Sequence, residues 1–292
     1  MDAHNEEVDM AEEGNQIEIA DAATATTAVG ELIRAAGDSA EAKEAGVQIG
    51  KVAVTLTKAL NNCLLPIAAV NYAFDRAKVY FASTFGDDLK EATKHIPAEV
   101  LVEPKPSLAG PALQGLAFSH EEPPLKSLYL ELLATAMDDR AAEQAHPAFV
   151  EVIRQLTANE AIQLQVVLEQ KQMPIVRIQA RQRNGGGTSL LWNHSLPYSD
   201  DNGLPGECPQ LPAMVDNWIR LGLVEVRYDT WLQNNASYEW TSTRPELISL
   251  KATHETEEVS VEPQRGIMRV TAFGHQFAKA TGLTPTMTSH SG

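Results

Sequence analysis

The sequence predicts an α+β protein that is mainly helical, with an N-terminal helical bundle followed by a winged-helix-like α/β domain. Alanine, leucine and valine dominate the apolar residues, and aromatic residues make up only 6% of the chain, a composition that favours helices. Apolar residues recur at three- and four-residue steps over most of the first half, whereas strict alternation begins near residue 175. With 292 residues, 43% of them hydrophobic, the chain is long enough for two domains.

Charge is distributed unevenly between the two halves. The formal net charge is -16, of which residues 1–143 carry -13 and residues 144–292 carry -3. Residues 1–21 hold eight acids and no lysine or arginine, so we expect a disordered acidic tail over residues 1–28. We predict a helical domain over 29–156, a second domain over 157–282 and a loose tail over 283–292. The acidic balance disfavours general binding to nucleic acid.

The cysteines and the N-terminus indicate a cytoplasmic protein. Cys63 and Cys208 are far apart in the sequence, which predicts neither a disulfide framework nor zinc-ligand spacing. The N-terminus carries acids where a secretion signal needs basic residues and an apolar run. No metal site or cofactor is predicted.

The first domain contains an uncharged stretch over residues 59–74. It is shorter than the roughly 20 apolar residues that span a bilayer, so the simpler interpretation is a buried helix pair broken at Pro66. The alternative is a segment that reaches a membrane or a partner when released. Its candidate residues are Leu60, Leu64, Leu65, Pro66, Ile67, Val70 and Phe74.

Further helices are predicted downstream. A mixed-charge amphipathic helix is expected over 75–94, followed by an extended proline-rich linker over 97–111. Ser107 is expected to cap a helix over 108–119, and a strong helix follows over 125–138, with Leu128, Leu132, Leu133 and Met137 on one side. Another helix opens at His146-Pro147.

The second domain begins with a capping box at residues 157–160 and a helix through residue 171. A strand over 175–183 and a returning strand over 189–195 flank an Asn-Gly-Gly-Gly turn, which predicts a hairpin. Alternation places Arg177, Arg181 and Arg183 on one face. The simpler interpretation is a solvated outer face; the alternative is a site for an anion or an acidic partner.

The remaining elements complete the order of a winged-helix-like domain. An amphipathic helix starts at residue 211 and ends at Gly222, a strand follows over 223–228, and residues 229–265 form a long β-excursion or flexible insert. A strand over 267–271 precedes a final helix through residue 280, capped by Thr271. Trp218 and Arg220 are candidate partner-binding residues, and because Arg220 is the only basic residue of its helix, protein contact is favoured over DNA contact.

Side chains that could carry chemistry are not grouped in any known catalytic pattern. The sequence contains no Gly-x-Ser-x-Gly, Walker or His-Glu-x-x-His motif, and its eight histidines are scattered. We therefore expect a protein that is not an enzyme.

Four spaced stretches carry a resemblance to a known family: residues 64–75, 96–111, 130–138 and 146–150. They resemble the abortive-infection protein alpha (Abi-alpha) family of bacterial phage-exclusion proteins over about residues 45–280. The resemblance implies an effector that a sensor protein from a neighbouring gene recruits to an early infection structure, a lipid vesicle at the inner membrane. The family supplies no catalytic residues. A protein-binding adaptor and a DNA-binding regulator remain alternatives, and a homo-oligomer stays open.

Overall fold

Residues 71–198 and 206–283 are described by a computed structural model, with side chains from residue 76 on. The described chain is α+β and mainly helical, as predicted. It divides into two compact units, one running to Ala158 and including Ala280–Gly282, the other comprising Asn159–Lys279 and Leu283 onward. The predicted acidic tail, residues 59–70 of the uncharged stretch and the C-terminal tail from residue 284 lie outside the described residues.

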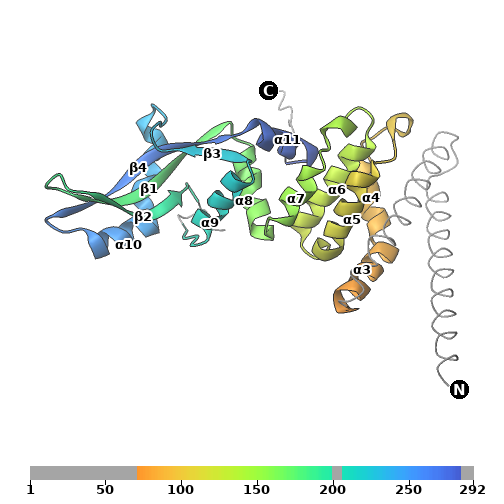
Figure 1. Cartoon of the computed structure of the whole chain (residues 1–292), viewed down its shortest axis with the longest axis horizontal. Helices are drawn as coiled ribbons and strands as arrows, with labels where there is room; N and C mark the ends of the chain where they lie inside the picture. The colour runs from red at the N-terminus through yellow and green to blue at the C-terminus, as the bar shows by residue number, and fades with distance from the viewer. Residues whose placement is uncertain (1–70, 199–205, 284–292) are drawn as a thin grey trace, which may run out of the picture. The chain divides into compact units, whose positions relative to one another are not determined.

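The first unit is built from helices (Figure 1). Helices α5 and α6 pack together, and α7 contacts both. The leucines that the sequence placed on one side of α6 are buried, and their neighbours on α5 and α7 are buried with them. The helices are α3 (Asn71–Ser83), α4 (Phe85–Thr93), α5 (Pro106–Ser119), α6 (Pro123–Met137) and α7 (Ala148–Arg154), with 3-10 turns η2 (Ala98–Val100) and η3 (Ala142–Gln144).

Three predictions in this unit were wrong. The single helix expected over 75–94 is interrupted at Thr84, which separates α3 from α4. The proline-rich linker is not extended throughout: it contains η2, and α5 already begins at Pro106. Pro106 supplies the start of α5 because proline is pre-organised for the first helical turn, and Ser107 lies inside the helix rather than capping it.

The second unit contains a four-stranded antiparallel sheet with strand order β2-β1-β4-β3. The central strands β1 and β4 are paired from Gln172↔Arg269 to Gln182↔Val259. The elements are α8 (Ala158–Leu168), β1 (Gln172–Gln182), β2 (Thr188–Ser195), α9 (Leu211–Arg220), β3 (Val224–Arg227), η4 (Asn235–Thr243), α10 (Pro245–His254), β4 (Val259–Val270) and α11 (Ala272–Ala280).

Several local predictions in this unit are confirmed. Strands β1 and β2 form the expected hairpin, and Gly185 at its turn has a φ of +83°, which glycine adopts without steric cost. Gly222 follows α9 with a φ of +74°, as a helix C-cap requires. Thr271 caps α11, since its hydroxyl accepts a hydrogen bond from Gly274 N at 2.9 Å.

Residues 229–265 differ from the expected β-excursion or flexible insert. They contain η4, α10 and the first half of β4, which begins at Val259 rather than Ile267. Leu247 of α10 is buried, and Arg244 and Glu246 are buried with it. The polar composition of residues 229–265 predicted an exposed insert. Arg244 and Glu246 are nevertheless buried, because they form an ion pair with each other. The resemblance to a winged helix stays a prediction.

Gly115 allows α5 and α6 to approach closely, and we predict that a methyl group there is costly. A Cβ atom on Gly115 would overlap the ring of buried Tyr129, so Gly115→Ala should lower the free energy of unfolding by about 1–3 kcal/mol. Urea denaturation followed by circular dichroism measures the change.

Gly86 provides the matched control, because it is also helical but has open space around its Cβ position. Gly86→Ala should cause no loss of stability, since alanine is favoured over glycine in helices. Gly115→Ala should also cost less in a Tyr129→Leu background. Equal costs in both backgrounds would contradict the overlap.

Candidate functional site

The candidate site is one face of the sheet, which we call the arginine face: Arg177, Gln179 and Arg181 of β1 with Ser260, Glu262 and Gln264 of β4. The register pairs Arg177 with Gln264, Gln179 with Glu262 and Arg181 with Ser260. Residues directly opposite each other in a ladder share a face, so the side chains form one polar surface. The β1–β2 hairpin contains three arginines and no acid, which makes it basic within an acidic chain.

The opposite face of the sheet is apolar. Ile178 of β1 and Val261 of β4 form a buried cluster with Leu247 of α10. Leu191 and Trp192 of β2 and Leu250 of α10 pack against this cluster and are partly buried. The alternation that the sequence showed in β1 therefore separates a core face covered by α10 from the arginine face.

One end of the arginine face contains a polar network around His194. Its Nδ1 lies 2.9 Å from the Tyr228 hydroxyl and its Nε2 lies 3.0 Å from Oδ1 of Asp216 on α9. The Arg177 guanidinium lies 4.7 Å from the centre of the Tyr228 ring and donates from Nε to Oε1 of Gln264 at 2.8 Å. Arg177 is therefore held by its neighbours rather than directed to solvent.

His194 is buried and has an unusual backbone conformation. Only 4% of the residue is exposed, and its φ is +52°. This left-handed backbone conformation destabilises a non-glycine residue by about 1–3 kcal/mol. Burial lowers the pKa of His194 below its ordinary value, and the hydrogen bond to Asp216 opposes this effect in part. A neutral imidazole can donate from Nε2 to Asp216 and accept at Nδ1 from Tyr228.

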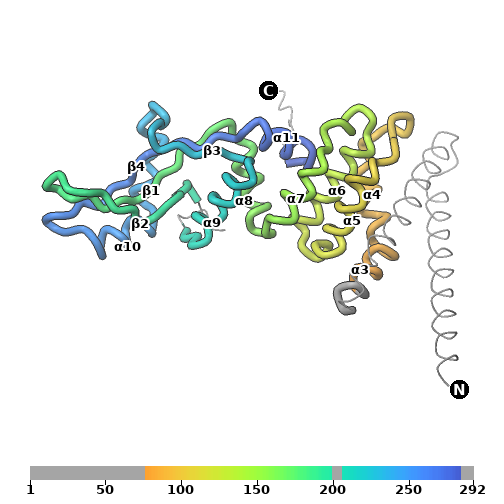
Figure 2. The backbone as a smooth tube through the Cα atoms, in the orientation of Figure 1, coloured from red at the N-terminus to blue at the C-terminus, as the bar shows by residue number. Residues whose placement is uncertain are grey.

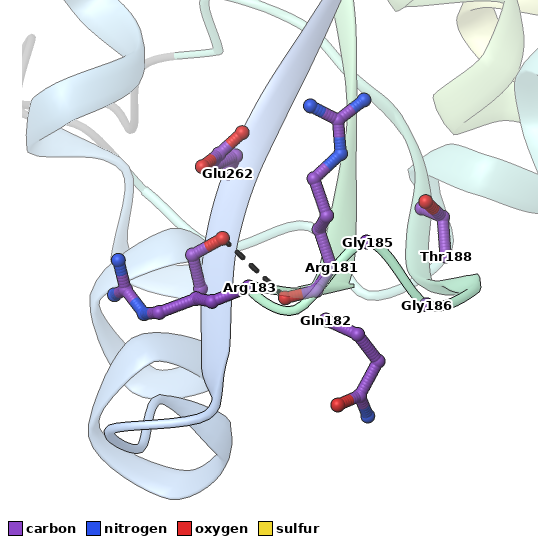
Figure 3. Close-up of a pocket in the computed structure, with 8 residues that line it drawn as sticks. Arg181, Gln182, Arg183, Gly185, Gly186, Thr188 and Glu262 are labelled. Carbon is purple, nitrogen blue, oxygen red and sulfur yellow. Dashed lines mark hydrogen bonds between the residues drawn. The ribbon is translucent and has the colours of Figure 1, made fainter.

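The other end of the arginine face is open (Figure 3). A surface depression there is lined by Arg181, Arg183, Gly185, Gly186 and Glu262, among others. Figure 3 shows the Arg181 and Arg183 side chains pointing in different directions. Arg183 lies 3.4 Å from Glu255. The side chain of Arg181 makes no hydrogen bond or ion pair with the residues that the structure describes.

The three arginines predicted on one face are therefore not gathered around a single anion. Arg177 contacts Gln264 and Tyr228, and Arg183 is exposed but pairs with Glu255. Arg181 is exposed as well, and of the three it is the one without a side-chain partner among the described residues. Figure 2 shows the β1–β2 turn and the start of β4 at the same end of the sheet, where Arg183 N donates to Glu258 O at 2.8 Å. This end can bind one carboxylate or phosphate, or an acidic protein surface.

The other predicted site residues occupy different environments. Trp218 is fully buried, so its ring contributes to the core of the second unit and not to its surface. Arg220 is exposed and donates from Nη2 to Oδ1 of Asn217 at 2.5 Å. The proposed membrane- or partner-active residues from Leu60 to Val70 lie outside the described residues, and Phe74 lies in α3.

A second polar cluster, which no sequence pattern predicted, is buried at the start of α10. Arg244 is 2% exposed and donates from Nε to Oε1 of Glu246 at 2.8 Å. The hydroxyl of Ser195, which is fully buried, donates to the same oxygen. Arg244 also donates to the carbonyls of Tyr198 and Gly206, at 2.5 Å and 2.8 Å. No periodic pattern marks such a cluster, because its members come from three separate segments.

Two further features are absent from residues 71–198 and 206–283. Histidine, cysteine, aspartate and glutamate side chains in these ranges do not gather in threes with metal-binding geometry. The helices in these ranges are too short or too polar to cross a bilayer.

The His194 network makes unfolding pH-dependent. Because the folded pKa lies below the unfolded value of about 6.5, the unfolded chain binds more protons at mildly acidic pH. The contribution of His194 to stability is therefore fully present above the unfolded pKa and is lost as the pH falls through the folded pKa. We predict that the free energy of unfolding declines between pH 8 and 5 and that His194→Gln reduces this slope.

Proton NMR titration of the His194 ring checks the cause. The wild-type midpoint should lie below the ordinary histidine value, and Asp216→Asn should lower it further, because Asp216 is what favours the charged imidazole. A wild-type midpoint above the ordinary value, or a rise in Asp216→Asn, would contradict this account of the network.

Comparison with known proteins connects both units to one family. Residues 78–281 match the family described as abortive infection alpha, which includes most of the described helices and the whole sheet. No curated protein and no solved structure is similar enough to match the chain. The matched region covers more than half of the 292 residues. The chain belongs to the abortive infection alpha family.

Proposed function

We propose that this chain is a non-enzymatic antiphage effector that acts by binding, after a sensor protein encoded by a neighbouring gene has recruited it. The observation that carries the proposal is the match to the abortive infection alpha family over residues 78–281, which supports a role in defence against phages. The recruitment step is proposed because the sequence resembles the effector half of the two-gene jumbo-phage killer defence system.

The arrangement of reactive side chains supports binding rather than catalysis. His194 is held between Asp216 and Tyr228, and the buried Ser195 hydroxyl is bonded to Glu246 instead of to the neighbouring histidine. These bonds hold the structure together and keep both side chains away from solvent. The open end of the arginine face instead presents Arg181 to solvent, as a docking surface for an acidic group would.

The proposed target is an early phage infection structure bounded by lipid. In this proposal the effector is recruited at the inner membrane and disables the vesicle, with the apolar residues 59–74 as the part of the chain that contacts lipid. The lipid target is named because the family resemblance implies it. The uncharged stretch is the candidate for the lipid contact, because apolar surface released from a protein partitions into a membrane interface.

An adaptor that binds a protein and does not act on lipid is the second candidate. The arginine face favours it, because a guanidinium fork binds carboxylates of an acidic protein as well as phosphates. A DNA-binding regulator receives less support. Arg220 is engaged by Asn217, and the acid Asp216 lies on the same helix, whereas a recognition helix directs several basic residues to the groove.

A phage-challenge assay tests the proposal in cells that express the protein with and without the neighbouring gene. We expect protection and the formation of fluorescent foci by a tagged protein only when both genes are present. Arg181→Glu should reduce protection at least about tenfold, because reversing one interfacial charge typically costs more than 1.4 kcal/mol. Protection without the neighbouring gene, or a diffuse protein in all conditions, would contradict recruitment.

Lys251→Glu is the matched control, since it reverses one exposed charge on α10 of the same unit. It should leave protection and folding unchanged. Leakage of dye from liposomes then separates the two candidates: release in the presence of the sensor supports an effector that acts on lipid, whereas recruitment without release supports the adaptor.

A further inference from the structure

The open end of the arginine face carries two opposite charges that form no ion pair within the described chain. Arg181 of β1 and Glu262 of β4 are both exposed, and neither side chain pairs with another described residue. Figure 3 shows both among the side chains that line the surface depression. The register pairs Arg181 with Ser260 and Glu262 with Gln179, so the two charges are diagonal neighbours on one face.

An exposed leucine lies on the same part of this face. Leu190 of β2 is 52% exposed and pairs with Gln179, so it shares the arginine face with Arg181. The pairs from Gln179↔Leu190 to Arg181↔Thr188 follow one another without a register shift. The apolar face of the sheet is covered by α10, whereas this half of the arginine face is open. It therefore offers one apolar side chain and two opposite charges to a partner.

The mixed charge of this surface determines which kind of partner fits it. A purely acidic surface would be attracted by Arg181 but repelled by Glu262, and a purely basic surface would be repelled by Arg181. A surface that carries both signs in the matching positions attracts both groups. A second copy of the same face supplies such a surface when a two-fold axis exchanges the two positions, because both copies then use one self-complementary patch.

The spacing of the ladder places this axis close to Leu190. In an ideal antiparallel sheet, strands lie about 4.8 Å apart and successive residues rise about 3.4 Å along a strand. With these values, the axis that exchanges the positions of Arg181 and Glu262 passes midway between Leu190 and Gln179, about 1.4 Å from each. The same rotation therefore brings Leu190 against Leu190 of the second copy. Sheets packed face to face lie about 10 Å apart, a gap that an arginine and a glutamate side chain together can bridge.

We propose that the open half of the arginine face binds a second copy of this chain in a two-fold dimer. Arg181 of each copy lies beside Glu262 of the other, and the two Leu190 side chains are in contact at the axis. The proposal rests on the docking role proposed above for this face, and it names Glu262 of a second copy as the acidic group that Arg181 binds. Two equivalent ion pairs thus flank a small apolar centre.

Sedimentation velocity on the purified full chain, without the sensor, tests this proposal over a range of protein concentrations. We expect the wild type to form a dimer. Arg181→Glu and Glu262→Arg should each weaken it at least about tenfold, because each variant places like charges opposite each other twice per dimer. An equimolar mixture of the two variants should associate again, since the exchange restores both ion pairs. The double variant Arg181→Glu/Glu262→Arg should associate by itself for the same reason.

Lys251→Glu and Glu239→Arg are the matched controls, since they reverse exposed charges on α10 and η4, outside the arginine face. They should leave the dimer unchanged. A wild type that stays monomeric at all concentrations would overturn the proposal, as would a dimer that survives both single reversals or a mixture that does not associate. A monomeric protein whose antiphage protection is still lost in Arg181→Glu would overturn the dimer alone, and would assign the face to the sensor.

Discussion

The pairing of β1 with β4 is the interaction on which the second unit depends. These strands occupy the centre of the sheet and carry β2 and β3 as their outer neighbours. Their register places Arg177 beside Gln264 and Ile178 beside Pro263, which separates a polar face from an apolar one. Because a slip of one residue exchanges the two faces of a strand, the same register determines both the core under α10 and the arginine face.

A buried ion pair holds α10 against this sheet. Arg244 and Glu246 are 2% and 6% exposed, and Glu246 binds Ser195 of β2 while Arg244 binds the carbonyls of Tyr198 and Gly206. Burying two charges is costly unless they are paired and hydrogen-bonded. Arg244 and Glu246 are paired, and both make further hydrogen bonds. Oε2 of Glu246 is buried without a partner among the described residues. The pair therefore connects the start of α10 to Ser195 and to the backbone at Tyr198 and Gly206.

Sequence patterns predicted the elements that depend on local signals. The hairpin followed from alternation and the glycine turn, α9 from its apolar spacing, and the cap of α11 from Thr271. The first half of β4 was missed because residues 259–266 become a strand by pairing with distant β1.

For the candidate site, alternation predicted that Arg177 and Arg181 share a face. It could not predict that Glu255 pairs with Arg183, since that contact depends on where α10 ends. The environment of His194 was also missed, because Asp216 and Tyr228 come from other elements.

The long sequence separation of the central strands has a consequence for synthesis on the ribosome. Gln182 pairs with Val259 and Gln172 with Arg269, so the partners are on the order of 80 to 100 residues apart, and such non-local contacts form late in folding. β4 ends 75 residues after the hairpin ends at Ser195, so at about 5–20 residues per second the hairpin waits roughly 4–15 s for β4 to be translated. During this interval the edge of β1 that later pairs with β4 is open to pairing with other chains.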